Sequence, residues 1–126
     1  MQVIVIPVTP FAQNCSLLIC PITKQAAIVD PGGDIDKILT QVNQHAVTVS
    51  KILLTHGHLD HVGASVALAE ALNVPIEGPH MGDKFWLEQL PMQSQMFGFA
   101  HTDAFLPQRW FEHGDTITVG EQALTI

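Results

Sequence analysis

The chain has 126 residues with 12 acidic and 5 basic side chains, which gives a formal net charge of −7 at pH 7. This length fits one domain or part of one, and a hydrophobic fraction of 47% with 13% charged residues excludes a disordered chain. So few cations disfavour binding to a nucleic-acid backbone, and no apolar run reaches the roughly 18 to 20 residues of a membrane span. We therefore expect a folded cytoplasmic chain that binds neither nucleic acid nor membranes.

Strands and one helix are predicted in the first half of the sequence. Apolar and β-branched runs predict strands over residues 3–8, 14–20 and 25–29. The third strand ends at the turn sequence Asp-Pro-Gly-Gly, after which Asp34 is a plausible N-cap. An apolar stripe at helical spacing then predicts a helix that contains Ile35, Ile38, Leu39 and Val42.

The second half continues the alternation of strands and helices. In order, the pattern predicts a strand over residues 47–54, a well-buried helix over 61–73, a strand over 74–77, a helix over 81–90, an irregular segment over 91–112 and a hairpin of 116–119 with 123–126. Large apolar side chains in the irregular segment predict a satellite core or the wall of a substrate pocket. The alternating pattern runs up to Ile126, from which we expect a longer domain.

Four residues of metal-ligating types follow the strand of residues 47–54: His56, His58, Asp60 and His61. Imidazole and carboxylate groups bind zinc and other first-row metals. In an extended segment, positions i and i+2 point the same way, so His56 and His58 can hold one ion. Asp60 and His61 lie where a helix begins, and we expect them to hold a second ion. Two bridged cations would lower the pKa of a shared water toward neutral, with Asp60 as the group that exchanges protons.

The sequence His56-Gly57-His58-Leu59-Asp60-His61 resembles the His-x-His-x-Asp-His signature of the metallo-β-lactamase superfamily. Residues 14–15, 27–32 and 114–120 are similar to segments before the first helix and after the central insertion of that family. The resemblance implies an α/β fold, namely half of an αββα sandwich with a mixed β-sheet and flanking helices. We expect residues 1–126 to be the N-terminal part of one such domain, apparently truncated.

Within the superfamily, the pattern looks most like the hydroxyacylglutathione hydrolase (glyoxalase II-like) branch, which hydrolyses thioesters such as S-lactoylglutathione. This resemblance implies that His56 and His58 bind a first metal and that Asp60 and His61 bind a second, with Asp60 also catalytic. Asp30 would orient one of these ligands through a hydrogen bond, or would simply form a turn before Pro31. The implied cofactor is zinc, with two ions in the complete domain and iron or manganese as possible replacements. The implied substrate is a small thioester, a glutathione conjugate.

The remaining metal-binding motifs of the family do not occur in the chain. The family has a Pro-Gly-His-Thr-Pro-Gly segment, a bridging aspartate and a last histidine, and the sequence contains none of these motifs. Two protein ligands per metal are fewer than the three of a catalytic zinc, so we expect this chain alone to be inactive. Two other functions stay open: an iron enzyme that oxidises persulfides, and a metal-binding fragment without catalysis.

The other histidines and the cysteines have weaker sequence signals. Because no partner spacing surrounds them, we interpret four histidines as surface or structural residues: His45, His80, His101 and His113. Cys15 and Cys20 are five residues apart, which places them on opposite faces of one strand. We expect both cysteines to carry reduced thiols and to act as small residues of a strand, neither binding a metal nor forming a disulfide.

Overall fold

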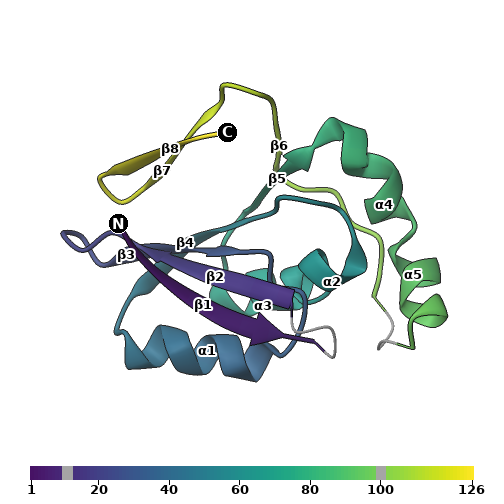
Figure 1. Ribbon diagram of the computed structural model, residues 1–126, viewed down its shortest axis with the longest axis horizontal. Coiled ribbons are helices and arrows are strands. Elements are labelled where there is room, and N and C mark those ends of the chain that lie inside the picture. The colour runs from purple at the N-terminus through teal and green to yellow at the C-terminus, as the bar shows by residue number, and fades with distance from the viewer. Residues whose placement is uncertain (10–12, 99–101) are drawn as a thin grey trace.

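The computed structural model describes residues 1–9, 13–98 and 102–126 as a mixed sheet with helices and a separate hairpin (Figure 1). The six-stranded sheet has the order β1-β2-β3-β4-β5-β6, and β7 and β8 form a second, two-stranded sheet. The strands are β1 (Gln2–Val8), β2 (Gln13–Ile19), β3 (Gln25–Val29), β4 (Thr48–Leu53), β5 (Ile76–His80), β6 (Arg109–Phe111), β7 (Thr116–Val119) and β8 (Gln122–Thr125). The helices are α1 (Ile35–Gln44), α2 (Leu59–Val62), α3 (Ser65–Leu72), η1 (Met81–Asp83), α4 (Lys84–Glu88) and α5 (Leu90–Met96).

The direction of the strands changes at β3. β1, β2 and β3 are consecutive antiparallel neighbours, whereas β3, β4, β5 and β6 run parallel. In the β3–β4 pair, Val29 lies opposite Leu53, so both strands end at the same level. The segments that follow β3 and β4 therefore leave the sheet side by side, although Asp30 and Thr55 are 25 residues apart in sequence.

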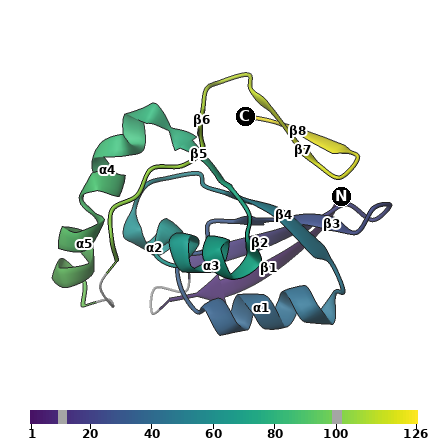
Figure 2. The ribbon, with the colours of Figure 1, turned by 180° about the vertical axis from the view of Figure 1, so that it is seen from behind.

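Helices cover one face of the six-stranded sheet, and the β7–β8 hairpin lies on the other side (Figures 1 and 2). The main core contains Ile38 of α1 and Leu68 of α3, both fully buried among side chains of the central strands. A smaller core lies beneath the hairpin and includes Ile117 and Val119. Next to this smaller core, an apolar groove of about 550 Å³ extends between the hairpin and the sheet as far as Thr55.

The first four strands and the hairpin occur where the sequence predicts them, but the predicted helix over residues 61–73 differs. It begins earlier, at Leu59, and is interrupted between α2 and α3. At the interruption the backbone N–H of Ala64 donates to the carbonyl of Pro31, which is distant in sequence, at 2.9 Å instead of continuing one helix. α3 is also less buried than predicted, since Ala67 and Glu70 are exposed.

One further expectation is corrected and another is met only in part in the described residues. The segment 91–112 is not wholly irregular, because it contains most of α5 and the edge strand β6. Pro91 fits α5 because it lies in the first turn, where a helix does not use the N–H that proline lacks. Asp34 is the N-cap residue of α1, as predicted, but its side chain makes no capping hydrogen bond to the helix. Its backbone is left-handed, with φ of 53°, and its carboxylate accepts the N–H of Thr9.

The helices of the described residues are short. α1 has ten residues, α3 has eight and α5 has seven. Within the ranges that the structure covers, no helix has the length and apolar character needed to cross a membrane.

The turn after β3 packs directly on α2, and Gly32 lies at the contact. A Cβ atom at Gly32 would lie 1.7 Å from the backbone carbonyl oxygen of Asp60. We expect Gly32→Ala to destabilise the chain by about 2 kcal/mol or more, because the backbone of the turn or of α2 must move. The matched control is Gly33→Ala, whose Cβ would meet the methyl group of Thr9 at 3.0 Å. Urea unfolding measures both changes, and equal stabilities of the two variants would contradict this account.

Candidate metal centre

The site begins with the placement of Asp30 at the end of β3. Its backbone is left-handed, with φ of 54°, a conformation that aspartate adopts more readily than most residues. Its N–H donates to the carbonyl of Leu53 at 2.9 Å, so the chain stays attached to β4 as it turns. The residue is 5% exposed, and its carboxylate lies inside the protein.

The buried carboxylate of Asp30 accepts hydrogen bonds from two segments. The backbone N–H of Thr55 donates to Asp30 Oδ1 at 2.8 Å, and the Thr55 hydroxyl contacts Asp30 Oδ2. His61 Nδ1 lies 3.0 Å from the same Oδ2. A buried charge is costly unless it is paired and hydrogen-bonded, and these contacts meet that requirement. Asp30 thereby connects the end of β3, the segment after β4 and α2.

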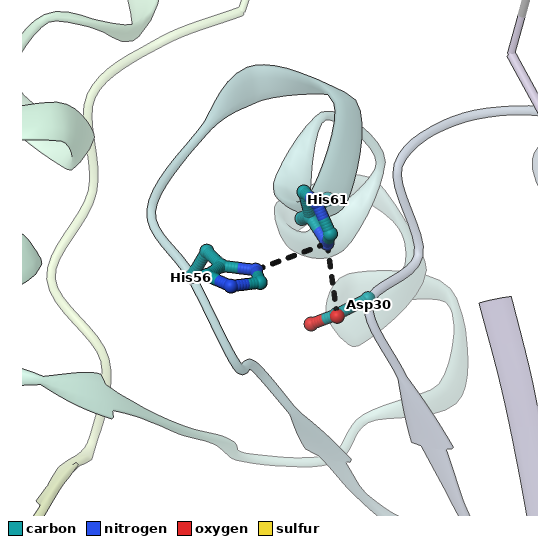
Figure 3. A group of neighbouring side chains, drawn as sticks. All are labelled: Asp30, His56 and His61. Carbon is teal, nitrogen blue, oxygen red and sulfur yellow. Dashed lines mark hydrogen bonds and ion pairs between the residues drawn. The ribbon is translucent and has the colours of Figure 1, made fainter. Parts of the chain in front are cut away.

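His56 joins this group through Thr55 and His61. Its Nδ1 lies 3.1 Å from Thr55 Oγ1 and 3.4 Å from His61 Nδ1. The two imidazole rings are 4.3 Å apart at an interplanar angle of 68°. One ligand atom from each of Asp30, His56 and His61 lies within 4.8 Å of the others, and Figure 3 shows these side chains converging. A carboxylate with two imidazoles is a donor set that divalent first-row metals accept.

The hydrogen bonds indicate which ring nitrogens are free. An ionised carboxylate can only accept, so the proton of the Asp30–His61 contact lies on His61 Nδ1. If the Thr55 hydroxyl donates to Asp30, its oxygen accepts a hydrogen bond from His56 Nδ1 at 3.1 Å, and the 3.4 Å approach of the two Nδ1 atoms is then a contact of two N–H groups and not a hydrogen bond. This pattern leaves the Nε2 lone pairs of both rings available, and Nε2 is a common metal-binding atom of neutral histidine.

The other two motif residues lie on the same loop but outside that three-residue group. The ring of His58 is 6.3 Å from that of His56 and packs instead at 4.4 Å from the ring of Trp86. Asp60 Oδ2 lies 3.9 Å from His61 Nε2, on the side of the ring opposite Asp30. The assignment of His56 with His58 and of Asp60 with His61 to separate metals stays a prediction.

Sequence reasoning missed two residues that contact the site. Thr55 directly precedes the motif, and its hydroxyl lies between Asp30 and His56. Its position next to His56 was a usable signal. Trp86 comes from α4 and packs on His58, and nothing in the spacing of the sequence connects these two residues.

Three of the four histidines interpreted as surface or structural lie in the described residues, and none of the three belongs to the group of Asp30, His56 and His61. His45 lies at the end of α1, and His113 is exposed beside the groove. His80 Nδ1 accepts the N–H of Gly82 at 2.9 Å, which is a structural role. The interpretation of His101 falls outside the described residues. Cys15 and Cys20 are both buried free thiols, which confirms the absence of a disulfide between them.

The fold and the cluster together define a class of protein: an α/β domain that presents imidazole and carboxylate groups at the ends of parallel strands. Comparison with protein families identifies that class. The chain belongs to the metallo-beta-lactamase superfamily, whose profile matches residues 8–126. The predicted fold class is thereby confirmed, and this fold implies binding of divalent metal ions.

Two relatives among curated proteins illustrate the similarity. The chain is 49% identical over 111 residues to hydroxyacylglutathione hydrolase GloC of Haemophilus influenzae, covering 88% of this chain and 52% of that protein. It is 38% identical over 81 residues to the probable metallo-hydrolase YqgX of Bacillus subtilis, covering 64% of this chain and 37% of that protein. The chain therefore spans about half the length, or less, of these relatives.

Solved structures support the same fold. The BLEG-1 B3 metallo-beta-lactamase matches with a TM-score of 0.83 and 29% identity, covering 98% of this chain and 59% of that one. The di-iron-bound form of TTHA1623 matches with a TM-score of 0.80 and 30% identity, covering 90% of this chain and 56% of that one. Both similarities extend over nearly all of the chain, so the arrangement of the sheet and of its helices is that of the superfamily.

The thiol of Cys15 gives a pH test of the packing near Asp30. Burial raises the pKa of Cys15 to about 12, and the negative charge of Asp30 acts in the same direction. The unfolded chain ionises this thiol near the ordinary thiol pKa of 9.0 and the folded chain does not, so stability should fall as the pH rises from 9 toward 12. Urea unfolding across this range should show a smaller decline for Cys15→Ala than for the wild type. Parallel declines in the two proteins would contradict this assignment.

Proposed function

We propose that the chain is the metal-binding N-terminal part of a thioester hydrolase of the hydroxyacylglutathione hydrolase type. In this proposal His56 and His58 bind one divalent ion, and Asp60 and His61 bind a second. Zinc is the proposed metal and a glutathione thioester is the proposed substrate. The chain spans 52% of the Haemophilus hydrolase, so this activity is assigned to the complete domain and not to residues 1–126 alone.

The observation that carries this proposal is that His56 and His61, one proposed ligand of each ion, lie side by side next to Asp30 at the ends of β3 and β4. These three residues are far apart in sequence or on different elements, yet their ligand atoms lie within 4.8 Å of each other. The thioester substrate is supported by the 49% identity to a protein named hydroxyacylglutathione hydrolase. The chain has only 5 basic side chains and a net charge of −7, which argues against a nuclease of the same superfamily.

The described side chains divide the work between orientation and binding. Asp30 already accepts three contacts, from the Thr55 N–H, the Thr55 hydroxyl and His61 Nδ1, which favours an orienting role over direct ligation. Thr55 holds the ring of His56 in the same way. A bound divalent ion would act as a Lewis acid on a carbonyl oxygen and would lower the pKa of a coordinated water. Asp60, 32% exposed beside His61, is placed to accept or donate a proton there.

The number of ligands limits what this part of the domain does alone. A catalytic zinc takes three protein ligands and keeps one position open, whereas the proposal assigns two motif residues to each ion. We therefore propose that the 126-residue chain binds metal but does not turn over substrate, and that the remaining ligands belong to the rest of the domain.

Metal binding is tested first, with His61→Ala as the key variant. Because His61 contacts both Asp30 and Asp60, we expect its removal to lower zinc affinity more than about 10-fold. His45→Ala, at the end of α1, is the matched control and should bind as the wild type does. Competition with a chromophoric chelator measures the affinities, and element analysis identifies the metal. Equal loss in both variants would place the metal elsewhere.

Thioester hydrolysis is tested by completing the domain. A chimera joins residues 1–126 to the C-terminal part of the Haemophilus relative that this chain does not cover. The two proteins are 49% identical over the 111 residues that they share. We expect the chimera to hydrolyse S-lactoylglutathione, His61→Ala to lower kcat/KM by at least about 100-fold, and residues 1–126 alone to be inactive. A folded, zinc-loaded chimera without thioesterase activity would refute the proposed reaction. Iron uptake with persulfide oxidation would establish the alternative enzyme.

A further inference from the structure

A second support holds the metal-binding loop from the side opposite Asp30. It consists of η1, α4 and α5, which we call the helical clamp (residues 81–96). We propose that Asp83 and Gln93 of this clamp are positioning residues for His58, because they hold the backbone amides on either side of it while Trp86 packs on its ring. This inference rests on the proposed metal site, but it concerns how the loop is held and not which reaction follows.

Asp83 fixes the residue before His58. The N–H of Gly57 donates to Asp83 Oδ2 at 3.0 Å. The two segments are also in close contact, since a Cβ atom at Gly57 would lie 2.8 Å from the carbonyl oxygen of Asp83 and 3.0 Å from Trp86 Cβ. Glycine at this position therefore lets the loop lie directly on the clamp, where the carboxylate reaches its backbone.

Gln93 fixes the residue after His58. Its side chain is 6% exposed, and its Oε1 accepts the N–H of Leu59 at 3.0 Å. Its Nε2 donates to the carbonyl of Trp86 at 2.9 Å, so one buried amide joins α5, α4 and the first residue of α2. Leu59 is the first helical residue, whose N–H has no acceptor within the helix, so Gln93 satisfies a buried donor. A buried amide with both ends paired has one allowed orientation, which makes it a rigid support.

Trp86 contacts the side chain of His58 itself. The two rings are 4.4 Å apart, and Phe85 packs edge-on against Trp86 at 5.2 Å. Within the described residues, Asp30 contacts His61 and His61 contacts His56, whereas the ring of His58 packs on the clamp. The loop is thus held at two places: Asp30 orients the histidines at its two ends, and the clamp orients the histidine between them.

The first experiment separates the hydrogen bond of Asp83 from its charge. Asp83→Ala removes both, Asp83→Asn keeps an acceptor oxygen, and Asp36→Ala on α1 removes one exposed charge elsewhere. We expect Asp83→Ala to weaken Co²⁺ binding about 10-fold, with Asp83→Asn within about threefold of the wild type and Asp36→Ala unchanged. The chain has 2 tryptophans, so Trp86 is the single tryptophan left in a Trp110→Phe background. Quenching of its fluorescence by Co²⁺ then reports binding of the metal beside His58. Equal weakening by Asp83→Ala and Asp83→Asn would overturn the proposal.

The second experiment needs no metal. Amide hydrogen exchange of the metal-free protein should show the N–H of Gly57 exchanging at least about 10-fold faster in Asp83→Ala than in Asp36→Ala. Gln93→Met should have the same effect on the N–H of Leu59. Gln95→Met is its control, because Gln95 is exposed on the same helix. Unchanged exchange at both amides would overturn the proposal even if the site binds metal and the completed domain hydrolyses thioesters.

The two proposals fail separately. If the chimera lacks thioesterase activity while Asp83→Ala releases the Gly57 amide and weakens Co²⁺ binding, the proposed function is wrong and the clamp is confirmed. If the chimera is active and neither variant changes exchange or metal affinity, the clamp is wrong and the function stands.

Discussion

The carboxylate of Asp30 is the interaction on which the site depends. It is buried at the end of β3 and accepts hydrogen bonds from the segment after β4 and from α2. Hydrogen bonds to a charged group contribute roughly 1.5 to 3 kcal/mol each, and an unpaired buried carboxylate would cost more than that. The parallel pairing of β3 with β4 brings these segments together, so the architecture of the sheet and the geometry of the histidines are parts of one structure.

Close packing between backbones makes this geometry specific. Gly32 lies against the carbonyl of Asp60, and Gly57 lies against Asp83 and Trp86. At both places a side chain would separate two segments that the hydrogen bonds require to be close. The loop that carries the histidines is therefore held between the turn after β3 and the helical clamp, and α2 itself is only four residues long.

Local patterns predicted much of the fold and the position of the motif. Strands β1 to β4 and the final hairpin follow directly from β-branched runs and turn residues, and the spacing from His56 to His61 pointed to the loop on which two of these histidines approach Asp30. The break between α2 and α3 was not predictable in this way, because it lies at a contact of Ala64 with the distant Pro31. Gln93 gave no signal for the same reason. Its partner Leu59 is 34 residues away, and an isolated glutamine in an apolar segment has no spacing that identifies a partner.

The solvent exposure of the site increases from the buried Asp30 to the exposed His56 and His58, and this arrangement suits a metal-binding role. Asp30 is 5% exposed, the His61 side chain is 16% exposed, and His56 and His58 are exposed. Imidazoles near water can exchange solvent for a metal ion at little desolvation cost, whereas ordering a free side chain costs conformational entropy. In this chain hydrogen bonds to Thr55 and Asp30 and ring packing on Trp86 have already ordered the three histidines. The contacts that orient these side chains thus lie partly inside the fold while His56 and His58 stay exposed, an arrangement that suits the preorganisation of a metal site.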